Sequence, residues 1–262
     1  MRVELVPITM TRCVNSSQLR DLNLERHLST PASKRHYVRT LFDTVERSYD
    51  WFTRLFSVGM DAAWKQQIVS LLRESGLAEG RVLDLATGTG DLVTRLEAQI
   101  PGAEVIGADL SARMLRRANR RALPHIRRNA VADMAELPYA SESLAAITAG
   151  YAFRNAPDHT AALAEAYRVL APNGLLVTLD FYLPPSRVWR RVYLGYLRIS
   201  GRLIGRLVHG VPETYGYIAA SLARWMTTDD FSASLRRAGF QLVDARLRLG
   251  GGIAIHLARK SG

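Results

Sequence analysis

Two glycines and two acidic residues lie close together in the segment Arg81–Asp91, which reads RVLDLATGTGD. The apolar residues at its start are typical of a strand buried on both faces. Gly88 and Gly90 then permit a tight turn and let a ligand approach the backbone closely. Apolar residues at helical spacing follow, and the first turn of a helix offers unpaired N–H groups to a polar ligand. The segment therefore predicts the first strand, turn and helix of a nucleotide-binding α/β fold.

The glycine turn differs from two common phosphate-binding motifs. No register supplies the Gly-x-Gly-x-x-Gly pattern of dinucleotide sites, and Gly90 is followed by Asp91 where a P-loop would continue with Lys. The residues from Asp84 to Gly90 read Asp-x-Ala-x-Gly-x-Gly, which is close to the signature of S-adenosylmethionine (SAM) methyltransferases. Asp109 ends the next apolar run, where a carboxylate can accept both ribose hydroxyls. We therefore predict a SAM site; the alternative is a glycine turn inside another doubly wound sheet.

Three further residues are candidates for contact with the same ligand. Asp133 and Met134 follow the expected third strand, 126–132. They can accept the adenine amino group and lie against the ring, or they are an ordinary loop acid and a core methionine. Tyr49 lies in an aromatic cluster on an expected helix before the sheet. Such a helix can lie over the carboxyl edge of the sheet, so Tyr49 either covers a ligand or packs in the core.

The sheet is expected to continue through four more strands. Arg154 and Asn155 follow the fourth, Leu144–Thr148, and a polar pair at this end of a strand can meet a substrate. The last two strands are joined through three glycines, which predicts an antiparallel hairpin because parallel strands need a longer crossover. The remaining expected strands are Leu175–Phe181, Phe240–Arg246 and Ile253–Leu257.

Length and composition limit the class of protein. A chain of 262 residues, 48% of them hydrophobic, can form one α/β domain with additions. No apolar run is long enough to span a bilayer, the single cysteine fits a reducing compartment, and the first segment lacks the apolar stretch of a secretory signal. We therefore expect a cytoplasmic protein. The net charge of +11 fits attraction to nucleic acid or to an anionic membrane, or simply an arginine-rich composition. Six histidines without ligand-like spacing give no reason to expect a metal.

Two parts of the chain are expected to be additions to the sheet domain. Residues 1–36 lack clear periodicity and predict a flexible extension with a linker at Thr30–Ser33, followed by the main domain, 37–262. Within that domain, 182–227 is expected to be a helical insertion. Its segment Arg187–His209 has apolar residues on one side and arginines on the other, although three glycines argue against one uninterrupted helix. It can form a lid, lie on anionic lipid, or pack in the core or in a dimer interface.

From about Val45 to Lys260 the chain resembles the ubiquinone/menaquinone biosynthesis C-methyltransferases. The resemblance rests on the glycine turn and on more selective motifs elsewhere in the same order. These motifs are Tyr49-Asp50 with Asp61 and Trp64, Ala132-Asp133 leading to Leu137-Pro138-Tyr139, Arg154-Asn155, Tyr167-Arg168-Val169-Leu170, Tyr215-Gly216-Tyr217 leading to Ser221, and Gly251-Gly252-Ile253-Ala254-Ile255-His256.

The resemblance implies a Rossmann-like class I methyltransferase fold: a mostly parallel seven-stranded sheet, an antiparallel C-terminal hairpin and helices covering the substrate. It implies transfer of a methyl group from SAM to a ring carbon of a prenylated benzoquinol or naphthoquinol. The implied catalytic residues are Arg154, Asn155 and Tyr215. The implied cofactor-binding residues are Tyr49, Asp84, Gly88, Thr89, Gly90, Asp109, Asp133, Met134 and Gly150.

Several residues depart from the family pattern. Tyr151-Ala152-Phe153 replaces Phe-Gly-Leu/Ile before the Arg-Asn pair, Thr53 replaces an Asn, and Gly150 stands where a side chain often helps to hold SAM. These changes leave another phenolic or polyketide-like acceptor as the alternative substrate. An RNA methyltransferase, suggested only by the charge, and a catalytically silent SAM-fold subunit are further alternatives. Peripheral contact with the inner face of the membrane and a homodimer are also expected, and no nucleic acid partner is.

Overall fold

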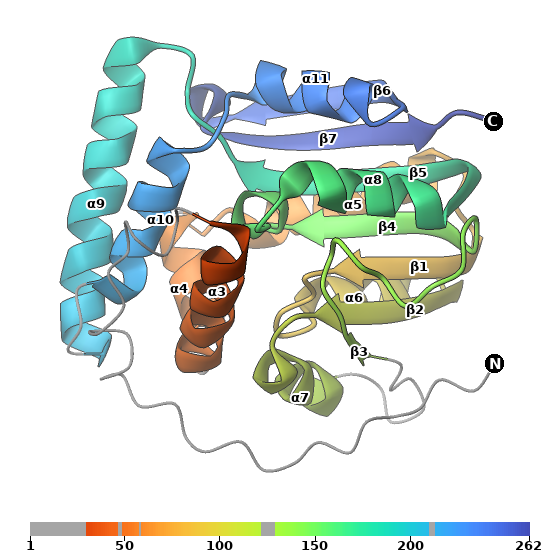
Figure 1. The fold of residues 1–262 in the computed structure, drawn as a ribbon, viewed down its shortest axis with the longest axis horizontal. Helices are drawn as coiled ribbons and strands as arrows, with labels where there is room; N and C mark the ends of the chain where they lie inside the picture. The colour runs from red at the N-terminus through yellow and green to blue at the C-terminus, as the bar shows by residue number, and fades with distance from the viewer. Residues whose placement is uncertain (1–29, 47–48, 58, 122–128, 210–212) are drawn as a thin grey trace.

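The structure is a computed structural model that describes residues 30–262 except 47–48, 58, 122–128 and 210–212. It describes only the backbone of 51–52, 55–56, 121, 207–209 and 213–215. The described strands form one seven-stranded sheet with the order β3-β2-β1-β4-β5-β7-β6 (Figure 1). The strands are β1 Glu79–Leu85, β2 Gly102–Asp109, β3 Ala130–Val131, β4 Leu144–Gly150, β5 Leu170–Phe181, β6 Phe240–Arg248 and β7 Ile253–Lys260.

The sheet is parallel from β3 to β5, and β7 pairs antiparallel with both β5 and β6. The expected sheet and its C-terminal hairpin are thereby confirmed. The strand order reverses between β1 and β4, and in open α/β sheets the carboxyl ends of the strands form a crevice at this point. In register, Asp84 pairs with Gly107 on one side and with Thr148 on the other. The predicted acids and the Arg-Asn pair thus reach the same edge of the sheet.

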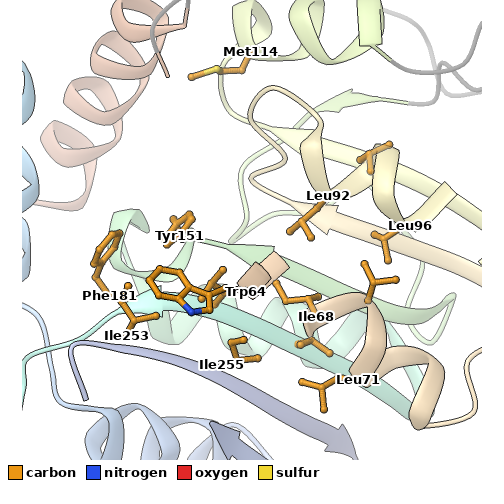
Figure 2. Close-up of a cluster of buried hydrophobic side chains, with 14 of the residues drawn as sticks. Trp64, Ile68, Leu71, Leu92, Leu96, Met114, Tyr151, Phe181, Ile253 and Ile255 are labelled. Atoms are coloured by element: carbon orange, nitrogen blue, oxygen red, sulfur yellow. The ribbon is translucent and has the colours of Figure 1, made fainter. Parts of the chain in front are cut away.

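Helices cover both faces of the sheet. On one face lie α5 (Asp61–Glu74) and α6 (Asp91–Gln99), and on the other lie α8 (His159–Val169) and α11 (Thr228–Arg237). Side chains of each central strand alternate between the two resulting cores, since successive residues of a strand point to opposite faces. Figure 2 shows the core under α5 and α6, in which Trp64 and Ile68 face the sheet. α7 (Ala112–Arg121) packs beside β2 and β3.

A third group of helices lies beyond the carboxyl ends of β1 and β4 (Figure 1). These are α3 (Pro31–Val45), α4 (Tyr49–Phe56), α9 (Arg187–His209) and α10 (Glu213–Ala223). The rings of Tyr37 in α3 and Tyr217 in α10 lie 5.3 Å apart and join the N-terminal helix to the insertion. This group therefore covers the crevice at the edge of the sheet.

The predicted boundary between extension and domain at His36 stays a prediction, but a helix runs across this position. Helix α3 begins at Pro31, and the side chain of Thr30 caps it by accepting a hydrogen bond from the Ser33 amide. Thr-Pro is typical of a linker, but both residues also suit the start of a helix. Thr is a good N-cap, and Pro in the first turn loses no hydrogen bond because the N–H groups of that turn have no partner within the helix. The remainder of the predicted extension, residues 1–29, lies outside the described residues.

The expected break in Arg187–His209 is also absent, because α9 is one helix of 23 residues. Each interior glycine costs a helix about 1 kcal/mol relative to alanine. Gly201 and Gly205 are buried, on the side of α9 that faces the rest of the protein. α9 packs along α10, and this tertiary packing offsets the weak helix propensity.

β5 begins five residues before the expected strand Leu175–Phe181, and the added segment contains an irregularity. The register of β4 and β5 shifts between Leu144 and Ala146, and Asn173 has a φ of 63°. The expected third strand is described only at its end, as β3, because 126–128 fall outside the described residues.

Replacing Gly90 with alanine should destabilise the fold by about 1–3 kcal/mol. Gly90 has a φ of 81°, and a Cβ atom there would lie 2.9 Å from Cβ of Ala118. The matched control is Gly195→Ala in α9, where a Cβ meets nothing within 4 Å, so alanine should stabilise by about 0.5–1 kcal/mol. Urea unfolding measures both. Equal effects of the two substitutions would contradict the assignment of strain to the glycine turn.

Candidate functional site

Two adjoining pockets open at the carboxyl ends of β1, β2 and β4. They share the wall formed by Tyr49, Ala86, Gly150 and Tyr151. The larger pocket continues past Asp109, Asp133 and Met134, and the smaller one reaches Asp84 and Thr89. All the predicted cofactor-binding residues except Gly90 line one or both pockets, and Gly90 is the N-cap residue of α6 directly behind them.

Asp109 holds the glycine turn through its carboxylate. One oxygen accepts a hydrogen bond from the amide of Gly88 and the other from the amide of Ser111, both at 2.8 Å. A carboxylate has about four lone-pair sites, so two hydrogen bonds leave acceptor capacity on both oxygens. Burial raises the pKa of Asp109 to about 6, although the two amides oppose this shift. Asp109 is thus a fixed acceptor beside the turn.

Asp84 is the second buried acid of the site. Its two oxygens each accept a hydrogen bond at 2.7 Å, one from the hydroxyl of Thr87 and one from that of Thr148. Burial raises the pKa of Asp84 to about 6, against the effect of these two hydroxyls. The acid therefore ends β1 with a defined orientation toward the smaller pocket.

Asp133 reaches the larger pocket, but the structure gives it a partner that the sequence did not predict. One of its oxygens accepts from the Ala135 amide at 2.9 Å, and the other lies 2.7 Å from Nη2 of Arg35. Arg35 lies in α3, within the segment expected to be a flexible extension. A ligand amino group at Asp133 would therefore share this carboxylate with Arg35.

Helix α4 is tied to the glycine turn. The hydroxyl of Thr89 donates a 2.6 Å hydrogen bond to Asp50, and the Tyr49 ring lies 3.7 Å from the place of a Cβ on Gly88. Burial raises the pKa of Tyr49 to about 12, so its hydroxyl stays protonated. Tyr49 and Thr89 thus both line the smaller pocket.

Sequence reasoning missed Lys65 as a residue of the smaller pocket. Its Nζ atom lies 2.8 Å from Asp61 and 3.0 Å from Asp91, and the Tyr151 hydroxyl donates to Asp61 at 2.9 Å. Burial alone would lower the pKa of Lys65, but the two carboxylates raise it, and the side chain remains a cation. Lys65 directly follows Trp64, which belongs to one of the family motifs, and this position could have indicated that Lys65 lies at the site.

Arg154 is buried in the short helix η1 (Phe153–Asn155), and it lines a third pocket instead of the two adjoining ones. It pairs with Asp180. Its amide donates to Asp180 at 3.0 Å, its Nε atom lies 3.6 Å from the same carboxylate, and its Nη1 atom donates to Ser221. Nε has no hydrogen-bond partner among the described residues, so the guanidinium keeps an unused donor.

Asn155 lines the larger pocket and is held from two sides. Its amide nitrogen donates to the carbonyl of Tyr151 at 2.7 Å, and its oxygen accepts from the Tyr217 hydroxyl at 3.1 Å. One N–H of the amide is left for a ligand. The predicted residue Tyr215 has a side chain outside the described part, so its predicted role stays a prediction. Tyr217, named only as part of the same motif, is the tyrosine that contacts the site.

Lys34 of α3 lines the same third pocket as Arg154. The Lys34 ammonium donates to the carbonyl of Arg154 at 3.1 Å and to that of Ala156 at 2.5 Å. Burial and the nearby Arg154 lower the pKa of Lys34 to about 8. Lys34 therefore fixes the backbone around η1 from the N-terminal helix. The sequence did not predict this role, because Lys34 lies in the segment expected to be a flexible extension.

The model of the ubiE/COQ5 methyltransferase family matches residues 30–260. The chain belongs to this family. A demethylmenaquinone methyltransferase of Thermus thermophilus is 38% identical over 83% of this chain and 98% of its own length. The ubiquinone/menaquinone biosynthesis C-methyltransferase UbiE of Desulfotalea psychrophila is 34% identical over 86% of this chain and 90% of its own. The family resemblance inferred from the motifs is confirmed, and this ubiE/COQ5 family member is a methyltransferase.

Solved structures agree on the fold. A SAM-dependent methyltransferase of Thermotoga maritima, described as a possible histamine N-methyltransferase, superimposes with a TM-score of 0.58 at 22% identity. The match covers 84% of this chain and all of the other. The class I methyltransferase fold is therefore shared, whereas identity this low says nothing about the acceptor.

Within the described residues, no three His, Cys, Asp or Glu side chains gather as a metal site would require. Nor does any helix there have the length and apolar character needed to cross a membrane.

Proposed function

We propose that this ubiE/COQ5 family member transfers a methyl group from SAM to a ring carbon of a reduced, prenylated quinone. The names of the relatives support a quinol of the benzoquinol or naphthoquinol class. The observation that carries the proposal is the arrangement of Arg154, Asn155 and Tyr217. The oriented amide of Asn155 lines the pocket that contains Asp109, and the buried cation of Arg154 is its neighbour in η1 and lines the third pocket.

The residues present fit SAM. Asp109 has acceptor capacity for the ribose hydroxyls, and Asp133 and Met134 line the same pocket where an adenine ring would be read. Asp84, Tyr49 and Lys65 line the adjoining pocket and offer both signs of charge to the amino and carboxylate groups of an amino acid. When bound, SAM supplies an electrophilic methyl group on a sulfonium.

The affinity for SAM should fall below pH 6. Burial raises the pKa of both Asp84 and Asp109 from 3.8 to about 6, and SAM needs the ionised acids as acceptors. We expect the Kd for SAM to rise about tenfold per pH unit for each acid that becomes protonated.

The same two acids also make the stability of the free protein depend on pH. The folded state holds their protons more tightly than the unfolded chain. The stability that the two acids contribute therefore falls as pH rises between their unfolded and folded pKa values.

Calorimetric titration with SAM on both sides of this pH measures the effect. The Asp109→Asn variant is the control, because it should lose one of the two protonation steps. A Kd that does not change with pH would contradict a role for ionised acids in binding.

The acceptor needs help to react, because the carbon beside a phenol is a weak nucleophile until the phenol loses its proton. A fixed cation near the ring oxygen lowers the pKa of that phenol, and Arg154 supplies one. A guanidinium does not act as a base, so the proton leaves to water. The free N–H of Asn155 can donate to the same oxygen. Burial raises the pKa of Tyr217 to about 12, so Tyr217 stays protonated and holds Asn155 in place.

A different small phenolic acceptor, such as a polyketide-like ring, is the second candidate. The departure at Tyr151–Phe153 fits either acceptor, because Tyr151 lines the pocket and its ring centroid lies 5.1 Å from that of Phe181. This aromatic wall suits a flat ring with or without a prenyl tail. A prenylated quinol would partition into lipid, so that acceptor implies work at a membrane surface. A homodimer remains a prediction.

Methyl transfer from labelled SAM to reduced and oxidised short-chain quinones tests the proposal. We expect a new carbon–methyl bond on the reduced ring only. The oxidised quinone is the matched control, because it lacks the phenol that must ionise. If SAM binds and neither ring is methylated, the quinol proposal fails, and phenolic acceptors without a quinol become the next test.

A further inference from the structure

Helix α9 carries a row of apolar side chains that face solvent. Between 43 and 73% of each of these residues is exposed. The spacing of four, four, three and four residues places them on one side of the helix. We name this row the apolar stripe; it consists of Val188, Val192, Tyr196, Ile199 and Leu203. At 1.5 Å per residue the stripe runs for about 22 Å.

The stripe is separate from the face of α9 that packs on the protein. Tyr193, Leu197 and Ile204 are buried, and they belong to the core cluster that also contains Tyr217 of α10. In Figure 1, α9 lies at the edge of the molecule with α10 between it and the sheet. The sequence predicted one apolar side for this helix. The structure divides that side into a buried half and an exposed half, so core packing does not explain the exposed half.

Arginines adjoin the apolar stripe. Arg187, Arg191, Arg198 and Arg202 are exposed, and a turn of 100° per residue places them in the sector next to the stripe. The helix contains no acidic residue. Its outer surface is therefore apolar along one line and cationic along the next, without internal neutralisation.

We propose that the apolar stripe docks on an anionic lipid bilayer, with α9 lying in the plane of the interface. Amphipathic helices of this kind bury apolar side chains at the boundary of headgroups and acyl chains. Basic residues beside the stripe meet lipid phosphates at the same depth. The row of arginines gives α9 a positive charge that complements the negative charge of this surface.

A second copy of the chain fits the stripe less well. A twofold interface apposes the same patch on both subunits. Two α9 helices that met antiparallel through their stripes would place both rows of arginines on the same side of the contact, and α9 has no carboxylate to pair with them. Like charges at such an interface are unfavourable. The charge pattern therefore favours lipid over self-association.

Docking through α9 would place the candidate active site at the membrane surface. α9 packs on α10, whose Tyr217 and Ser221 contact Asn155 and Arg154. The benefit of this placement for a prenylated acceptor rests on the proposed function. The docking itself does not, because lipid binding is measurable without any acceptor.

Flotation of the full chain with vesicles tests the docking. The probes are vesicles of phosphatidylcholine alone and of equal parts phosphatidylcholine and phosphatidylglycerol. We expect the protein to float with the mixed vesicles and to do so less as salt rises. Val188→Gln/Ile199→Gln/Leu203→Gln should lower the partition coefficient about tenfold or more, since each removes apolar area from the lipid contact. Equal binding to both kinds of vesicle would contradict the anionic preference.

The matched control is Val131→Gln. It removes an apolar residue that is 57% exposed in β3, at the opposite edge of the sheet from the β6–β7 connection that Trp189 of α9 contacts, so binding should not change. The single variant Ile199→Gln, at an exposed helical position, repeats the test with less risk to folding. Wild-type binding by both stripe variants would overturn the proposal.

Sedimentation velocity and turnover complete the design. If the stripe variants alter the oligomeric state and leave vesicle binding intact, the stripe is a contact between copies and the proposal fails. Turnover of a short-chain quinol without vesicles should be equal in wild type and stripe variants. Loss of vesicle binding with this turnover retained supports docking. If neither protein methylates the quinol, the proposed acceptor is wrong and the docking proposal is unaffected.

Discussion

Replacing Arg154 with glutamine should reduce kcat for methyl transfer by about 10²–10³-fold, the usual effect of removing one electrostatic group from a buried site. The affinity for SAM should change little, because Arg154 pairs with Asp180 and not with Asp109. The guanidinium is buried and contacts the rings of Phe181 and Tyr217, and its Nε atom faces Asp180 without a hydrogen bond to any described residue. Single-turnover methyl transfer and calorimetric SAM binding measure the two quantities.

The same substitution also affects stability, because it leaves the carboxylate of Asp180 buried without its cation. Breaking a buried ion pair from one side costs about 3–5 kcal/mol. Arg154→Lys is the matched variant, since it keeps a cation for Asp180 and loses the planar fork. A purely structural role predicts that both variants lose stability and activity together.

The pH profile separates the two roles of Arg154. If its cation lowers the pKa of the acceptor phenol, kcat of Arg154→Gln should rise with pH to more alkaline values than kcat of the wild type. Arg154→Lys should restore most of the wild-type profile. An unshifted profile in Arg154→Gln would show that Arg154 only supports the fold.

Replacing Asp109 with asparagine should weaken SAM binding about a hundredfold, or about 2.7 kcal/mol. Asparagine has one acceptor oxygen, whereas Asp109 already uses both of its oxygens to hold Gly88 and Ser111. The variant must lose an amide partner, a ribose hydroxyl or both. The effect should appear in the Kd for SAM and in the KM for SAM.

The control for this prediction lies on the same strand. Glu104 of β2 pairs with Arg81 outside the pockets, so Glu104→Gln changes the same kind of charge without touching the site. Its affinity for SAM should equal that of the wild type. A similar loss in both variants would assign the effect to the general charge of the strand and contradict the role of Asp109.

The sequence by itself determined the sheet and the acids at its edge. Buried parallel strands are short apolar runs, and a glycine turn followed by helical spacing has few other structural solutions. Asp84 and Asp109 stand at the ends of such strands, so strand order alone brought them together. The family motifs then pointed to Arg154 and Asn155 for the same reason, since both follow β4.

Only the tertiary structure decided which side chains complete the site. Asp180 pairs with Arg154, Tyr217 orients Asn155, and Lys34 and Arg35 reach the site from a helix expected to be a flexible extension. These contacts join elements far apart in the chain, and no local periodicity records them. The same holds for α9. A helical pattern shows that one side is apolar, but only the packing of α10 decided which part of that side is buried and which part faces solvent.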